Sequence, residues 1–203
     1  MLKVLTVSCA LMGAAFSLPT ADPVTSATTS PNAQEFVVDG GHSSVLFRVM
    51  HLSASPFWGR FNQVTGKFMI DASKLDESYV EIEIPTESID SNSEGRDRHL
   101  KSQDFFSAKE FPKLTFKSTK VEAGDDGMFE ITGDLTLRGK SKSITIKAEN
   151  TGTATVSERF GLRTGFESTF EIDRTDFGVS YGTGGVLGEK VRIVIALEGK
   201  LPD

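Results

Sequence analysis

Apolar and polar side chains alternate with a period of two along most of the chain beyond residue 35. Val80, Ile82 and Ile84 alternate with two glutamates, and Phe170 and Ile172 flank Glu171. Because successive side chains of a strand point to opposite faces, this period predicts strands with one buried face. Turn residues separate eight or nine such segments, which span residues 35–39, 44–52, 57–71, 78–85, 113–122, 128–137, 143–156, 159–173 and 190–201.

The connections between these segments are short. Arg138-Gly139-Lys140 and residues 122–127 have the composition of hairpin turns. An up-and-down order of antiparallel strands favours closure into a barrel, since closure removes exposed sheet edges. The pattern therefore predicts an all-β domain built as a barrel, and a two-sheet sandwich is the alternative architecture.

One segment departs from the strand pattern. Ser91 and Glu94 have the spacing of a capping box, with Ser91 as the N-cap, and a short helix is expected over residues 93–102. Leu100 is the main apolar residue of this segment, so the helix is expected to lie over the barrel surface or its mouth. A plain connector and a gate for a ligand are both compatible with this position.

The amino terminus has the layout of a signal peptide. Lys3 precedes an apolar run over residues 4–18, which is shorter than the about 20 residues that span a bilayer. We expect residues 1–27 to be a signal peptide, cleaved after Ala27 or Ala21, residues 28–34 to be a flexible leader, and residues 35–203 to be one domain. Cys9 is the only cysteine and lies in the apolar run, so the mature domain has no disulfide, and lipidation of Cys9 is the weaker alternative.

Charge and composition exclude several classes of partner. The chain has 203 residues, of which 38% are hydrophobic, and its formal charge is -6. A net acidic chain without clustered lysine and arginine does not favour nucleic acid or an anionic membrane surface. The strands alternate apolar residues with Glu, Lys, Arg and Asp, so they lack the outward apolar band of an integral membrane barrel.

Candidate chemistry is sparse. The three histidines are His42, His51 and His99, and their spacing fits no closed zinc site, so no metal is expected. A structural hydrogen bond and a ligand contact are both open to them. The chain has no Gly-x-Ser-x-Gly elbow and no His-Glu-x-x-His motif, and we therefore predict no catalytic residues.

Several blocks of sequence together resemble the YceI-like family and cover nearly all of residues 35–201. They are His42-Ser43 to His51-Leu52, Gly59-Arg60-Phe61, Arg96-Asp97-Arg98-His99-Leu100 to Asp104-Phe105-Phe106, Phe111-Pro112, and Gly133 to Gly139 followed by Lys142. The resemblance implies an eight-stranded antiparallel, lipocalin-like barrel with one or two short helices, located in the bacterial periplasm or secreted. It further implies a lumen that encloses an isoprenoid such as a polyprenyl phosphate or a quinone, with no catalytic residues. Residues 53–58 depart from the family pattern, in which this loop often contains glycine.

The period of two also selects which side chains face the lumen. On the strand over residues 44–52, an inward Arg48 would lose its hydration without a partner, so the alternate face, with Phe47, is expected to point inward. Extended to the other strands, this rule predicts a lumen lined by Val45, Phe47, Val49, His51, Phe68, Ile70, Ile82, Phe116, Ile131, Leu135, Phe170 and Ile195. The predicted contacts for a ligand head group at the mouth are His42, Arg96, Arg98 and His99.

An isoprenoid in such a lumen would gain up to roughly 4 kcal/mol per five-carbon unit before binding costs, at about 0.8 kcal/mol per CH₂. The tail would then supply affinity for storage, transport or protection of the lipid. Two alternatives are an enzyme acting on a bound prenyl lipid and a structural barrel whose own side chains fill the lumen. Pairing of barrels into a homodimer is left open by the sequence.

Overall fold

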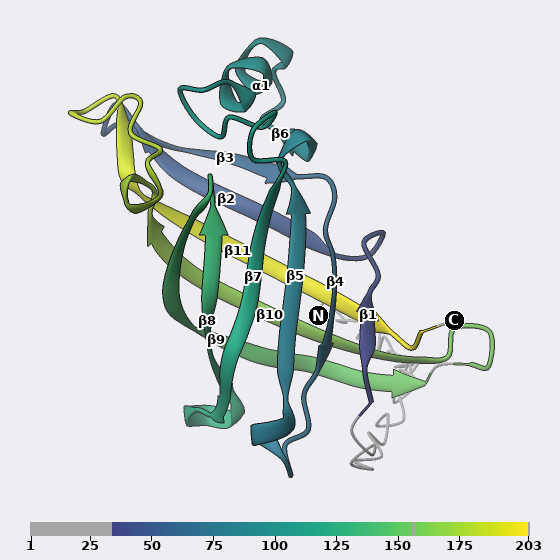
Figure 1. Cartoon of the computed structure of the whole chain (residues 1–203). Helices are drawn as coiled ribbons and strands as arrows, with labels where there is room; N and C mark the ends of the chain where they lie inside the picture. The colour runs from purple at the N-terminus through teal and green to yellow at the C-terminus, as the bar shows by residue number, and fades with distance from the viewer. Residues whose placement is uncertain (1–33, 156, 203) are drawn as a thin grey trace, which may run out of the picture.

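The computed structural model of this chain describes residues 34–155 and 157–202, which form an antiparallel β-barrel (Figure 1). The predicted signal peptide and all but the last residue of the predicted leader lie outside these residues. The strands are β1 (Phe36–Val38), β2 (Ser44–His51), β3 (Ser55–Phe61), β4 (Thr65–Met69), β5 (Tyr79–Pro85), β6 (Ile89–Asp90), β7 (Lys113–Ala123), β8 (Phe129–Leu137), β9 (Lys140–Thr155), β10 (Leu162–Asp173) and β11 (Leu187–Lys200). The helices are α1 (Glu94–Lys101) and the 3-10 turns η1 (Leu75–Glu77), η2 (Thr86–Ser88), η3 (Asp125–Gly127) and η4 (Arg174–Phe177).

The barrel closes through the short strand β1. β1 pairs with β4, where Phe36 lies opposite Phe68, and also with β11, where Val38 lies opposite Gly199. The closed ring therefore runs β1-β4-β5-β7-β8-β9-β10-β11 and returns to β1. Eight antiparallel strands confirm the predicted barrel, and the sandwich alternative is wrong.

The segment predicted as one strand over residues 57–71 is two strands in the structure. The chain bends between Phe61 and Thr65, where the amide of Asn62 donates to the carbonyl of Ser88 at 2.9 Å. The bend lets β3 pair with β2 and β6 while β4 pairs with β1 and β5. β1 and β2 are separated by a similar corner, and both of them pair with β11. A period of two cannot predict such corners, because they follow from the curvature of the closed barrel.

The helix is present, but the predicted capping box is wrong. Ser93, not Ser91, is the N-cap of α1, and its side chain makes no capping hydrogen bond. Ser91 is buried, and its amide donates to the Asp97 carboxylate at 2.8 Å. This contact fixes the start of α1 to the end of β6, above one end of the barrel (Figure 1). In the described part of the chain, no helix is long and apolar enough to cross a membrane.

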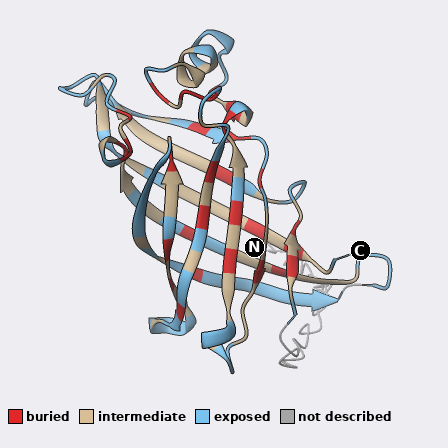
Figure 2. Ribbon diagram, viewed as in Figure 1, coloured by how far each residue is buried: buried red, intermediate tan, exposed pale blue. Residues whose placement is uncertain are grey.

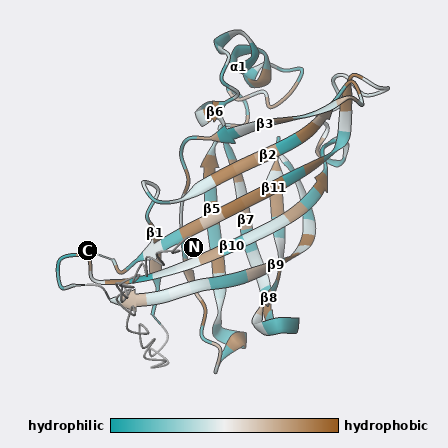
Figure 3. Cartoon of the chain, turned by 180° about the vertical axis from the view of Figure 1, so that it is seen from behind, coloured by the Kyte–Doolittle hydropathy of each residue, from teal (hydrophilic) through white to brown (hydrophobic). Residues whose placement is uncertain are grey.

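Alternation along the strands separates an apolar interior from a charged exterior. Figure 2 shows buried and exposed segments alternating along β5 and β7, and Figure 3 shows apolar segments on β2 and β11. Cross-strand ion pairs lie on the outer face, such as Lys117 with Glu81 at 2.9 Å and Lys113 with Glu83 at 2.6 Å. Because these pairs are exposed, each stabilises the fold by about 1 kcal/mol at most.

Candidate ligand-binding cavity

A cavity of about 560 Å³ runs inside the barrel. This volume lies within the about 300–1,000 Å³ that is typical of small-molecule sites. All twelve side chains predicted to face the lumen line it, which are Val45, Phe47, Val49, His51, Phe68, Ile70, Ile82, Phe116, Ile131, Leu135, Phe170 and Ile195. Their contact with a ligand stays a prediction. Since nearly all of the lining is apolar, the cavity suits a hydrocarbon chain better than a polar solute.

The orientation of β2 is the one expected from the cost of burying Arg48 without a partner. Val45, Phe47 and Val49 face the cavity, whereas Arg48 and Met50 lie on the opposite face, along a separate shallow depression of the outer surface. Gly59 of β3 lies opposite Phe47, whose ring covers it so closely that a Cβ atom there would be 2.3 Å from the ring. The Phe47 ring is therefore fixed over β3 on the side of the lumen.

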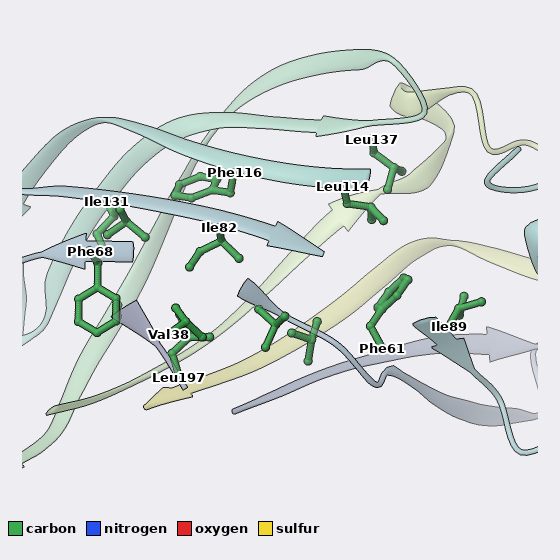
Figure 4. Packing of buried hydrophobic residues seen from close by; sticks show 14 of the residues in the cluster. Val38, Phe61, Phe68, Ile82, Ile89, Leu114, Phe116, Ile131, Leu137 and Leu197 are labelled. Atoms are coloured by element: carbon green, nitrogen blue, oxygen red, sulfur yellow. The ribbon is translucent and has the colours of Figure 1, made fainter. Parts of the chain in front are cut away.

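Aromatic rings close one end of the cavity. Phe68 stacks on Phe36 with ring centroids 5.8 Å apart and meets Phe166 edge to face at 5.4 Å. Phe129 lies tilted against Phe166, with ring centroids 6.1 Å apart. Figure 4 shows Phe68 at the opposite end of the core from Phe61, which packs against Phe106 just beyond α1. The cavity is thus blocked at the aromatic end, and the end near α1 is its mouth.

Arg96 is the basic side chain fixed at this mouth. Its Nε donates to Ser91 Oγ at 2.9 Å, and a second guanidinium nitrogen donates to the Ser91 carbonyl. The guanidinium carbon lies 4.3 Å from the centroid of the Phe57 ring, at the start of β3. Arg96 lines the cavity yet is exposed. It therefore offers a positive charge where the apolar lumen meets solvent.

An aromatic cluster of His99, Phe105 and Tyr181 forms the other side of the mouth. The His99 ring meets Phe105 at 5.0 Å and Tyr181 at 4.8 Å, and Phe105 lies 5.1 Å from Tyr181. His99 Nε2 also lies 2.9 Å from an oxygen of Asp104. The cluster joins α1 to the loop that precedes β11, so these two segments can separate only by breaking its edge-to-face ring contacts.

His42 and Arg98 do not line the cavity, unlike Arg96 and His99. Arg98 is exposed on α1. His42 lies in the corner between β1 and β2, which turns its side chain into solvent, where its Nδ1 is 3.0 Å from Asp39 Oδ2. Ligand-type atoms of Asp39, His42 and Glu198 lie within 4.8 Å of one another, but Arg163 is 3.6 Å from Asp39 and supplies positive charge there. The corner is an ion-pair network, and the predicted role of His42 at the mouth does not fit its position.

The contact between His42 and Asp39 shifts both titrations. The hydrogen bond to Asp39 is the main cause that raises the pKa of His42, and the same bond is the main cause that lowers the pKa of Asp39. The histidine contributes stability below its unfolded pKa and loses it as pH rises through the raised pKa. The carboxylate contributes above its unfolded pKa and loses stability as pH falls through the lowered one. The pair therefore stabilises the corner fully between about pH 4 and pH 6.5.

A direct check is the pH titration of the His42 imidazole by NMR. We expect the Asp39→Asn variant to lower the pKa of His42 toward its ordinary value, because the charged partner is lost. An unchanged pKa in this variant would show that the ion pair does not form in solution.

Arg174 is a functional candidate that the sequence did not reveal. It is buried and lines the cavity, and it begins η4 directly after β10. Its guanidinium donates to the carbonyls of Val179 at 2.7 Å, Tyr181 at 2.9 Å, Leu187 at 3.1 Å and Gly188 at 2.8 Å. Burial is the main cause that lowers the pKa of Arg174. Arg174 therefore holds the loop that carries Tyr181 in place beside the mouth.

The chain is similar in sequence to a known domain family and to bacterial proteins. The family model of the YceI-like domain matches residues 36–199. A UPF0312 protein of Shewanella denitrificans is 40% identical over 191 residues, which cover 93% of this chain and 94% of that protein. A UPF0312 protein of Vibrio cholerae is 41% identical over 150 residues, which cover 73% of this chain and 79% of that protein.

Three solved structures share the barrel. BcnA of Burkholderia cenocepacia superposes with a TM-score of 0.71 at 22% identity and covers 80% of this chain and 99% of its own. The YceI protein of Campylobacter jejuni has a TM-score of 0.66 at 29% identity, over 75% of this chain and 90% of its own. A domain of Saccharophagus degradans, described as polyisoprenoid binding, has a TM-score of 0.64 at 14% identity, over 84% of this chain and 100% of its own.

Proposed function

Because this chain belongs to the YceI-like family, we propose that it is an exported protein that binds one long apolar isoprenoid in its barrel. The ligand class is a polyprenyl phosphate or a quinone. The role is storage, transport or protection of that lipid in the periplasm or outside the cell, after removal of the signal peptide. The protein acts by binding and not by catalysis.

The observation that carries this proposal is the apolar cavity, whose lining is buried at the end of Phe68 and exposed to solvent at the end of Tyr181 and Val186. A blocked apolar tube favours a slender chain that enters by its tail, since each buried CH₂ contributes about 0.8 kcal/mol before binding costs. Polar groups that line the cavity near its mouth include Arg96, His99 and Tyr181. A tail-in, head-out orientation follows, and the polyisoprenoid-binding domain of the same fold supports this class of ligand.

The two alternatives are less compatible with the cavity. A lumen filled by its own side chains would not leave about 560 Å³ of space. An enzyme that acts on a bound lipid by covalent catalysis would need an activated nucleophile in the lining. Of the two serines there, Ser168 donates to the backbone carbonyl of Lys147 at 2.6 Å and Ser55 to that of Pro56 at 3.5 Å. Within the described residues, neither serine has a base as its hydrogen-bond partner.

The head group can be tested with two arginines of the same helix. We expect Arg96→Ala to weaken binding of a polyprenyl phosphate about tenfold, because a charge-assisted contact at the mouth is lost. Binding of a quinone of similar tail length should change much less, since its head group is neutral. The affinities can be measured by native mass spectrometry after delipidation and reloading.

Arg98→Ala is the matched control, because Arg98 lies on α1 but does not line the cavity. It should leave the affinity for both ligands unchanged. Equal losses for phosphate and quinone in Arg96→Ala would mean that Arg96 only holds α1 on Ser91 and Phe57. Failure of both lipids to bind the unaltered protein would refute the proposed function.

A further inference from the structure

Three exposed apolar side chains gather at the mouth of the cavity. Leu52 is 58% exposed, Val186 47% and Tyr181 46%. Leu52 lies in the turn between β2 and β3, and its amide donates to the Val186 carbonyl at 2.9 Å, in the loop before β11. We call Leu52, Tyr181 and Val186 the apolar rim. The two loops project together from one end of the barrel, at the upper left of Figure 1.

The backbone conformation at Leu52 is one that disfavours a leucine side chain. The amide of Ala54 donates to the carbonyl of His51 at 3.0 Å, and the two residues between them have positive φ, 51° at Leu52 and 53° at Ser53. Such turns favour asparagine and glycine, whereas leucine is strained at positive φ. An exposed leucine in this turn opposes both the backbone preference and solvation, and this combination points to a contact outside the barrel.

The apolar rim is continuous with the cavity. Tyr181 and Val186 belong to both, because each lines the cavity and is also exposed to solvent. An apolar chain that leaves the cavity at this end meets the rim before it meets water. A partner that covers the rim therefore also covers the exit of the cavity.

We propose that the apolar rim docks into the interface of a phospholipid bilayer, so that a lipid tail passes between bilayer and cavity without crossing water. The passage of lipid rests on the proposed function, whereas docking rests on the rim alone. A second copy of the chain is the less favoured occupant. The area that three side chains can bury falls far short of the about 800 Å² per partner that a stable interface buries. The chain is acidic overall, so attraction comes from the apolar rim and needs no anionic lipid.

The test is flotation of the protein with vesicles of pure phosphatidylcholine. We expect the unaltered protein to float with the vesicles and Leu52→Asn to bind about tenfold more weakly, because an inserted leucine is lost. The same variant should unfold at an equal or higher temperature, since asparagine tolerates positive φ. Weaker vesicle binding by a variant that unfolds at an equal or higher temperature would show that Leu52 acts in docking and not in folding.

Phe160→Asn is the matched control. Phe160 is 54% exposed and precedes β10, at the end of the barrel away from the mouth. The Phe160→Asn variant should float with the vesicles like the unaltered protein. Equal flotation of Leu52→Asn and the unaltered protein, or no flotation of either, would overturn docking. A dimer in light scattering that Leu52→Asn dissociates, without vesicle binding, would instead identify the rim as an interface between copies.

Lipid binding is measured separately by reloading the same variants with polyprenyl phosphate from detergent. Leu52 does not line the cavity, so Leu52→Asn should reload like the unaltered protein. Vesicle binding without reloading of any variant would refute the proposed cargo and leave docking intact. Reloading without vesicle binding would refute docking and leave the cargo intact.

Discussion

Phe47→Asp is expected to abolish lipid retention. The ring of Phe47 lines the cavity and packs against Phe61, with centroids 5.8 Å apart. An aspartate at this position would place a carboxylate in an apolar lumen, where desolvation costs several kcal/mol, and would remove a ring that contributes about 3 kcal/mol. The variant should therefore bind no isoprenoid in native mass spectrometry and unfold at lower urea concentration.

The neighbouring position provides the control. Arg48 is adjacent in sequence but faces the outer surface, so Arg48→Asp should retain lipid and change the free energy of unfolding by about 0.5 kcal/mol at most. Phe47→Ser removes the ring without adding a carboxylate, so it tests packing apart from charge. This variant should also weaken lipid retention. Loss of lipid in Arg48→Asp together with a silent Phe47→Ser would show that the face of β2 is assigned wrongly.

Arg174→Met is expected to cause a large loss of stability. Arg174 is 5% exposed and donates to four backbone carbonyls of the loop before β11 and its first residues. Methionine fills a similar volume but donates to none of them, and each buried carbonyl left unpaired costs about 1–3 kcal/mol. We expect a loss of about 3 kcal/mol or more in urea unfolding.

The same variant should loosen the mouth. Hydrogen exchange of the amides over residues 179–187 should accelerate, because the loop loses its anchor. Arg192→Met is the control, since Arg192 is exposed on the outer face of β11 and should tolerate the change. Unchanged exchange in Arg174→Met would contradict the role of Arg174 as the anchor of this loop.

The sequence predicted most strands and the inward face of each because both depend on a local property, whereas the closed barrel was inferred from the order of the hairpins and from the family resemblance. A period of two decides which side chains of a strand share a face, and one unfavourable residue, Arg48, was enough to orient β2. The corner between Phe61 and Thr65 was missed because it depends on closure of the ring. The N-cap of α1 was assigned wrongly because Ser91 is bound by Asp97, which lies in the first turn of the helix.

The residues of the mouth were predicted only in part, because the mouth is formed by contacts between segments that are distant in sequence. An arginine in sequence is expected to be exposed, and nothing near Arg174 signals that carbonyls from a later loop will surround it. Tyr181 becomes a neighbour of His99 and Phe105 only when the loop before β11 meets α1 and the segment that follows it. His42 was placed at the mouth from its residue type, whereas the corner between β1 and β2 carries it elsewhere.

Isoprenoid binding is tested most directly by identifying the lipid that the protein carries in its own host. The protein should be purified without detergent, its mass measured under native conditions, and the extracted lipid identified by mass spectrometry. We expect one isoprenoid per barrel, a polyprenyl phosphate or a quinone, which denaturation releases. A mass equal to that of the polypeptide alone, with no lipid in the extract, would contradict isoprenoid binding by this barrel.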